Sequence, residues 1–97
     1  MTATKHFNER AERIARIKST IGIGTPYITR RIDKGHANGA ELHTITTSGV
    51  VIVQNARTLK VVTVLVARPQ QLKRLGITDS RLIEIARDNQ RKGYNNF

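Results

Sequence analysis

The segment most informative about the fold is residues 40–67, AELHTITTSGVVIVQNARTLKVVTVLVA. Threonine, valine and isoleucine dominate it and strong helix formers are scarce, which is typical of β-strands. Ser48-Gly49 has the composition of a two-residue hairpin turn, and a second turn is expected at Asn55–Thr58. The stretch therefore predicts an antiparallel meander with strands at residues 41–47, 50–55 and 59–67.

The register of the first hairpin decides which side chains share a face of the sheet, because side chains alternate along a strand. If Thr47 pairs with Val50, one face carries His43, Ile45, Val50, Ile52 and Gln54. The opposite face then carries Leu42, Thr44, Thr46, Val51 and Val53. The apolar run 61–66 predicts a strand that is covered on both sides or lies centrally.

Helical patterns flank the strands on both sides. Residues 4–21 place apolar side chains at steps of three and four, the period of an amphipathic helix. A last helix is expected at 79–92, with Asp79 as its N-cap and Gly93 as its end. Residues 94–97 are expected to form a tail.

Residues 25–39 give a weaker signal. Ile28 and Ile32 are four residues apart, which favours a short helix beginning near Pro26. The glycines at 35 and 39 favour a loop instead. The sequence leaves a loop and a short helix as alternatives here.

These elements together predict an α+β fold in a single domain, residues 1–97. It consists of an N-terminal helix, an antiparallel β-meander of three or more strands, and a C-terminal helix.

Composition limits the classes of function. The chain has no cysteine, which excludes a disulfide scaffold, a thiolate metal site and a cysteine nucleophile. No apolar run approaches the roughly 18 residues of a membrane span, and the polar N-terminus is unlike a secretory signal. We therefore expect a cytoplasmic location and no membrane partner.

Charge is the strongest functional signal. Seventeen Lys and Arg against seven Asp and Glu give a net charge of +10. A field of this sign attracts polyanions, so RNA or another nucleic acid is the expected partner. An acidic partner protein is the alternative, and it would include an antitoxin or immunity protein.

Motifs for metal, cofactor and dinucleotide binding are missing from the sequence, so neither a metal nor a cofactor is expected. The remaining chemistry is histidine among arginine, lysine and threonine. RNA can be cleaved by its own 2′-hydroxyl without a metal, given a base, an acid and cations for the transition state. Histidine supplies the first two near neutral pH, and arginine or lysine supplies the third.

Candidate site residues follow from this chemistry. His6, Arg10 and Arg13 are spaced to share one side of the first helix. The expected catalytic residues are His43, His6, Arg10 and Thr63. The expected nucleic-acid-binding residues are Arg13, Arg30, Arg31, Lys34, His36 and Arg68. Each also has a plain structural interpretation, as a solvated helix flank, a loop residue or a hydrogen-bonded strand residue.

Three stretches of the chain carry a resemblance to a known group. The spacing His-x-x-x-Arg-x-x-Arg from His6, then GVVIVQN at 49–55 and TLKVVTV at 58–64, resembles the barnase–EndoU–colicin–RelE (BECR) group of small bacterial and phage ribonucleases and toxins. The resemblance covers about residues 5–68. It implies metal-independent RNA cleavage, with roles for His6 and Arg10 on the helix, His43 on the first strand and Thr63 on the third.

The sequence thus leaves two functions open. The first is a small basic, metal-independent endoribonuclease or toxin-like RNA-cleaving domain. The second is a non-catalytic nucleic-acid-binding protein of phage or bacterial origin. The scarcity of aromatic residues argues against a platform that stacks single-stranded bases, and so favours cleavage or binding to the backbone.

Overall fold

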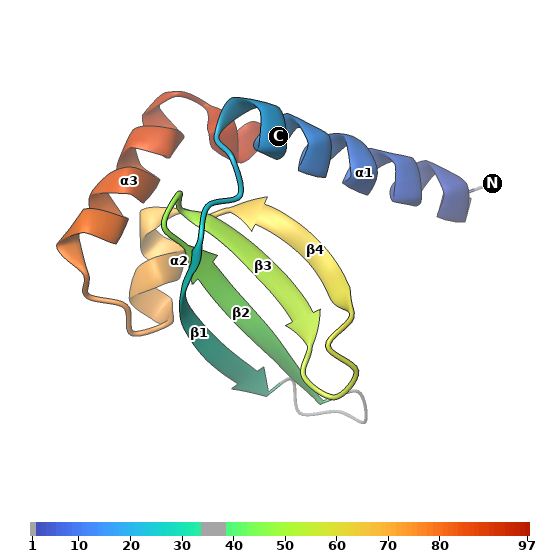
Figure 1. The fold of residues 1–97 in the computed structure, drawn as a ribbon, viewed down its shortest axis with the longest axis horizontal. Coiled ribbons are helices and arrows are strands. Elements are labelled where there is room, and N and C mark those ends of the chain that lie inside the picture. Colours follow the sequence, from blue (N-terminus) through green and yellow to red (C-terminus); the bar gives the residue numbers. More distant parts are fainter. Residues whose placement is uncertain (1, 34–38) are drawn as a thin grey trace.

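The computed structural model describes the backbone of residues 2–33 and 39–97, and within these ranges the side chains from residue 9 onward. The predicted α+β fold is confirmed, with an N-terminal helix, an antiparallel sheet and a C-terminal helix (Figure 1). The elements run in the order α1 (Thr2–Thr20), β1 (Pro26–Asp33), β2 (Ala40–Thr46), β3 (Val50–Asn55), β4 (Val61–Val66), α2 (Pro69–Arg74), α3 (Ser80–Arg91) and a 3₁₀ turn, η1 (Tyr94–Asn96).

The sheet has four strands in the order β1-β2-β3-β4, and every neighbouring pair is antiparallel. The additional strand is β1, so the prediction of a loop or short helix within residues 25–39 is wrong for Pro26–Asp33. The four-residue spacing of Ile28 and Ile32 indicated a helix, but backbone pairing with β2 outweighs this local helical preference. Pro26 is compatible with a strand because it stands at the first position, on an edge strand.

The β2–β3 hairpin has a different register from the predicted one. Ile45 pairs with Val51, so the chain turns through three residues with Gly49 at φ +80°, rather than through two. This is the three-residue hairpin in which a glycine adopts the left-handed conformation. A shift of one residue moves every side chain of a strand to the other face, so the predicted division of side chains between faces is wrong for β3 relative to β2.

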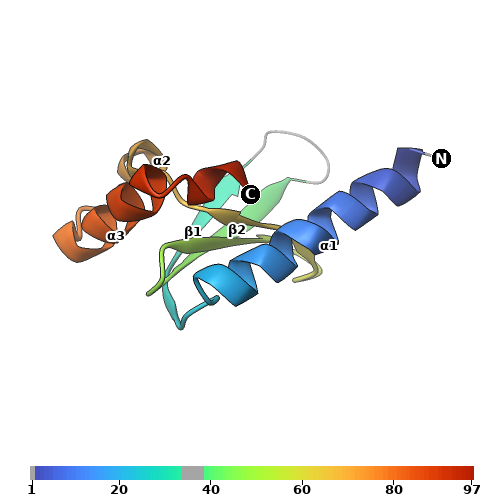
Figure 2. The same cartoon turned by 90° about the horizontal axis from the view of Figure 1, so that it is seen from above.

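Two apolar clusters lie on opposite faces of the sheet. On one face, Ile45, Val51 and Val53 pack with residues of α2 and α3, including Leu72 and Leu82. On the other face, Val50 and Val64 pack with Ile17 of α1. Figure 2 shows α1 on one side of the sheet and α2 with α3 on the other.

Helix ends follow the predicted signals. Asp79 caps α3, its side chain accepting hydrogen bonds from the main-chain N–H groups of Arg81 and Leu82 at 2.9 and 3.3 Å. Gly93 follows α3 with φ +78°. Residues 94–97 are not a loose tail, however, because Asn95 Nδ2 donates to the main-chain oxygen of Val66 at 2.9 Å.

Across the described residues, no helix combines the length and the apolar character needed to cross a membrane.

Candidate nucleic-acid interface

One face of the sheet is covered at one end only. In Figure 1, α1 lies beyond the upper ends of the strands and the segment that follows it passes in front of them at that end, while the remaining length carries no helix on the near side. Two cross-strand rows form this surface, which we call the open face. The rows are Thr29–Thr44–Ile52–Val64 and Arg31–Leu42–Gln54–Val61. Thr44 and Val64 are buried, Val64 against Ile17 of α1, so the accessible part of the face consists of the other six residues. Side chains paired across strands point to the same side of a sheet, so these residues form one surface.

The open face combines hydroxyl, amide and aliphatic groups and has no aromatic ring in its two rows. Thr29 and Thr44 share a hydrogen bond between their hydroxyl oxygens at 3.0 Å. Val61 remains 53% exposed although it lies in a strand. Such a surface offers contact area and a few polar groups, but no platform for base stacking.

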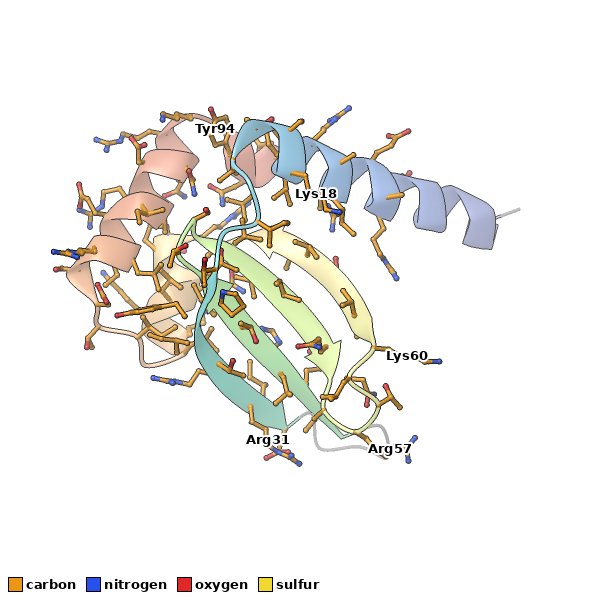
Figure 3. The ribbon with its side chains drawn as sticks, viewed as in Figure 1. Lys18, Arg31, Arg57, Lys60 and Tyr94 are labelled. Atoms are coloured by element: carbon orange, nitrogen blue, oxygen red, sulfur yellow. The ribbon has the colours of Figure 1, made fainter. Side chains whose placement is uncertain are left out.

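Four exposed cations surround this face, and we call them the basic rim: Lys18, Arg31, Arg57 and Lys60. In Figure 3, Lys18 lies at the α1 end, Lys60 beside the start of β4, and Arg31 and Arg57 at the opposite end. The rim therefore draws on α1, β1 and the β3–β4 loop.

Most of the rim is electrostatically unpaired. Among the described residues, Lys18, Arg57 and Lys60 form no ion pair, and Arg31 contacts Asp33 at 3.5 Å with both side chains largely exposed. An exposed pair of this kind is weak in water. Other carboxylates have partners elsewhere, since Glu84 contacts Arg87 and Asp88 contacts Lys92 on α3. The excess positive charge is thus free to act around the open face.

The β3–β4 loop presents two of the rim cations on an ordered backbone. The side-chain oxygen of Asn55 accepts hydrogen bonds from the main-chain N–H groups of Arg57 and Thr58 at 2.8 and 2.9 Å. Leu59 has φ +63°, a left-handed conformation that is uncommon for a non-glycine residue. The sequence predicted a turn in this segment but did not indicate its cations as binding residues. The sequence feature that could have revealed these cations is a pair of basic residues beside a turn between two apolar strands.

The predicted catalytic residues on the strands lie on the opposite face. Arg30, His43, Val53 and Thr63 form one cross-strand row, so their side chains share the side of the sheet that packs on α2 and α3. His43 and Thr63 are two strands apart, which corresponds to roughly 10 Å. Thus they share a row without direct contact.

His43 is held by a carboxylate. Its Nε2 lies 3.2 Å from Oε1 of Glu41, and its side chain is only 12% exposed. A carboxylate can only accept, so Nε2 carries the proton in this pair. The other ring nitrogen, Nδ1, is buried and has no hydrogen-bond partner among the described residues.

Arg13 and Thr63, predicted for different roles, are in direct contact. Nη1 of Arg13 donates to Oγ1 of Thr63 at 3.3 Å, and Nε donates to the main-chain oxygen of Phe97 at 3.4 Å. Arg13 and Arg68 both line a cavity of about 330 Å³ beside the end of β4. Neither His43 nor Thr63 lines that cavity.

The other predicted residues are dispersed. Arg10 is exposed on α1, and Nε of Arg30 donates to the main-chain oxygen of Leu75 at the end of α2. Lys34 and His36 lie outside the described residues, and so does the side chain of His6. No group of three or more metal-ligating side chains occurs within the part of the chain that the structure describes.

Comparison with known proteins finds no relative of this chain. No family model matches the chain, and neither a curated protein nor a solved structure is significantly similar to it.

Proposed function

We propose that this protein binds nucleic acid, with RNA as the expected partner, without cleaving it. The observation that carries the proposal is the basic rim around the open face. Lysine and arginine side chains at the edge of an exposed sheet can contact successive phosphates of a strand lying across it. The absence of cysteine is compatible with a cytoplasmic location, where RNA is available.

Binding is directed at the backbone of the nucleic acid. The open face has no aromatic residue in its rows, so base stacking does not contribute to affinity there. The exposed hydroxyl of Thr29 and the side-chain oxygen of Gln54, whose Nε2 donates to the main-chain oxygen of Leu59, supply hydrogen bonds that tolerate many sequences. We therefore expect weak sequence preference and a strong dependence on salt.

A salt series tests this proposal. The anisotropy of a labelled 16-nucleotide RNA should show binding at low salt, with log K falling linearly as log salt rises. Polyglutamate of equal charge is the competitor that represents an acidic protein partner. Binding that is undetectable at low salt, or polyglutamate that competes as well as unlabelled RNA, would overturn the proposal.

Metal-independent RNA cleavage is a second candidate, favoured by the contact between His43 and Glu41. Glu41 holds Nε2 of His43 and leaves Nδ1 as the base. Nδ1 is buried in the free protein, so cleavage by this mechanism requires that RNA binding expose it. Arg30 stands opposite His43 to meet a phosphate. The base would take the 2′-hydroxyl proton, and the 2′-oxygen would attack phosphorus to form a 2′,3′-cyclic phosphate. The bond from phosphorus to the 5′-oxygen would break, with the leaving 5′-oxygen protonated by water. Membership in the barnase–EndoU–colicin–RelE group stays a prediction.

Cleavage has its own test. It should proceed in excess EDTA and leave a 2′,3′-cyclic phosphate or a 3′-phosphate. His43→Ala should lower the single-turnover rate by roughly 10²–10⁴-fold, the usual range for losing an acid or base. Products with a 5′-phosphate, a requirement for Mg²⁺, or full activity in folded His43→Ala would rule out this mechanism.

A further inference from the structure

A cavity of about 330 Å³ lies where α1, the end of β4, α2 and η1 meet. Its volume is at the lower end of the range typical of small-molecule sites, roughly 300–1,000 Å³. Ile17 and Leu65 contribute apolar wall, whereas most of the remaining lining is polar or aromatic. The cavity is separate from the two rows of the open face.

Two guanidinium groups give the cavity its charge. Arg13 is fixed by its hydrogen bonds to Thr63 and to the main-chain oxygen of Phe97, while Arg68 is exposed at the start of α2. Among the described residues that line the cavity, none is aspartate or glutamate. Paired guanidinium groups without a carboxylate side chain beside them favour an anion, and phosphate fits their planar donor geometry.

Carboxamides supply the second recognition element. Gln71, Asn95 and Asn96 line the same cavity. Nδ2 of Asn95 donates to the main-chain oxygens of Val66 and Ala67 at 2.9 and 3.3 Å. These two acceptors fix the orientation of the side-chain amide, with Oδ1 as its other terminal atom. That oxygen, Oδ1, is buried and has no donor among the described residues. Asn95 is therefore engaged within the protein, and Gln71 and Asn96 are the carboxamides that can donate to and accept from the edge of a nucleobase.

Two aromatic side chains, Tyr94 and Phe97, form the remaining part of the cavity wall. The rings of Tyr94 and Phe97 lie with centroids 5.3 Å apart, and both residues line the cavity. Figure 3 shows Tyr94 near the end of α1, where η1 meets the rest of the fold. An aromatic ring in a polar cavity can stack on a planar base.

From these groups we infer that the cavity binds a single nucleotide, with Arg13 and Arg68 on its phosphate and the carboxamides on its base. The ligand class is a nucleotide with a phosphate monoester, either free or at the end of an RNA strand. The inference deepens the proposed function and rests on it for its biological setting. Its chemistry, however, can be measured without any RNA.

Calorimetric titration of the full chain with adenosine, guanosine, cytidine and uridine 5′-monophosphates tests the inference. At least one should bind more tightly than its nucleoside and than inorganic phosphate. Arg68→Gln should weaken that binding by about tenfold, the loss expected for a charge-assisted hydrogen bond. Arg74→Gln, an equal charge change on α2 outside the cavity, should change affinity less than about twofold.

Gln71→Ala separates base recognition from phosphate binding. It should weaken the nucleotide but leave the affinity for inorganic phosphate unchanged. Three results would overturn the inference: no binding of any of the four nucleotides at millimolar concentration, inorganic phosphate binding as tightly as the best nucleotide, or equal losses in Arg68→Gln and Arg74→Gln.

Two further measurements distinguish the sources of the nucleotide and separate this inference from the proposed function. A 5′-phosphorylated RNA that binds more tightly than its unphosphorylated form identifies a strand end as the ligand, and equal binding of the two identifies the free nucleotide. An Arg57→Ala/Lys60→Ala variant should lose affinity for RNA but keep its affinity for the nucleotide. If the protein bound the nucleotide but no RNA, the proposed function would be refuted and the nucleotide site would stand.

Discussion

Arg13 on α1 and Thr63 on β4, fifty residues apart in sequence, are joined by a hydrogen bond of 3.3 Å from Nη1 to Oγ1. Thr63 belongs to the row that faces α2 and α3, so the side chain of Arg13 reaches it around the free edge of β4. It also holds the guanidinium of Arg13 at the wall of the cavity that we infer to bind a nucleotide. A residue expected to bind phosphate is thus positioned by one expected to take part in catalysis.

Thr63→Val tests this link. The change keeps the branched shape of the side chain and removes the acceptor, so we expect a loss of about 1 kcal/mol in the free energy of unfolding. For a chain of this size that corresponds to about 4–8 °C in Tm. Thr63→Ser, which keeps the hydroxyl, should retain most of the stability; equal losses in both variants would contradict a role for the hydrogen bond.

Gly49→Ala should be more damaging. Gly49 has φ +80°, and a Cβ there would lie 3.0 Å from Nδ2 of Asn89 and 3.1 Å from Cγ2 of Ile85 on α3. Conformational strain and the close approach together should cost about 2 kcal/mol or more.

Gly76→Ala is the matched control, because Gly76 has φ +72° and a Cβ there would meet nothing within 4 Å. It carries the conformational strain alone, about 1 kcal/mol. Chemical denaturation of both variants measures the difference, and equal losses would show that the hairpin does not pack closely on α3.

Leu59→Asn should stabilise the protein. Leu59 has φ +63° and is 57% exposed, so it bears strain with little burial to offset it. Asparagine tolerates this conformation, and the expected gain is about 0.5–1 kcal/mol in urea denaturation. Leu59→Ala removes the same side chain but keeps the strain. If the alanine variant gained as much stability as the asparagine variant, exposure rather than backbone strain would be the cause.

Stability should fall in acid through Asp79. The hydroxyl of Tyr27 donates to Oδ2 of Asp79 at 2.6 Å, and this bond, with the main-chain N–H of Leu82, holds the pKa of Asp79 below its ordinary value of 3.8. A lowered folded-state pKa contributes stability above the unfolded pKa, and that contribution is lost as pH falls through the folded value.

The comparison variant is Asp79→Asn, measured by thermal unfolding between pH 7 and pH 2. The Tm advantage of the wild-type protein should be largest near pH 7 and should shrink below about pH 4. An advantage that stays constant down to pH 2 would show that the ionised carboxylate contributes nothing.

The sequence predicted the local elements better than their pairing. The α1 stripe, the Asp79 cap and the β2–β4 stretch carry periodic or capping signals that act over a few residues. Strand β1 lacks such a signal, because its pairing with β2 depends on residues that lie farther along the chain. The hairpin register depended on whether Gly49 takes a left-handed conformation inside a three-residue turn, which composition alone does not decide.

The candidate site was predicted by residue type and not by location. Arg13, Thr63 and Arg68 were identified separately, and only the fold brings Arg13 to Thr63 and to the cavity shared with Arg68. Lys18, Arg57 and Lys60 were not singled out, because their importance comes from lying around one face of the sheet. The fold brings residues from distant parts of the chain to one surface, and short sequence motifs do not record this arrangement.

The slope of RNA affinity against salt, compared between two charge-matched double variants, tests whether RNA lies across the open face. Arg57→Ala/Lys60→Ala removes two cations of the basic rim, and Lys73→Ala/Arg74→Ala removes two exposed cations of α2 on the other side of the sheet. Each lost phosphate contact lowers the slope by about 0.7–0.9, so the rim variant should lose about 1.4–1.8. The α2 variant should keep the wild-type slope. Equal slopes in the two variants, or a larger loss in the α2 variant, would contradict binding across the open face.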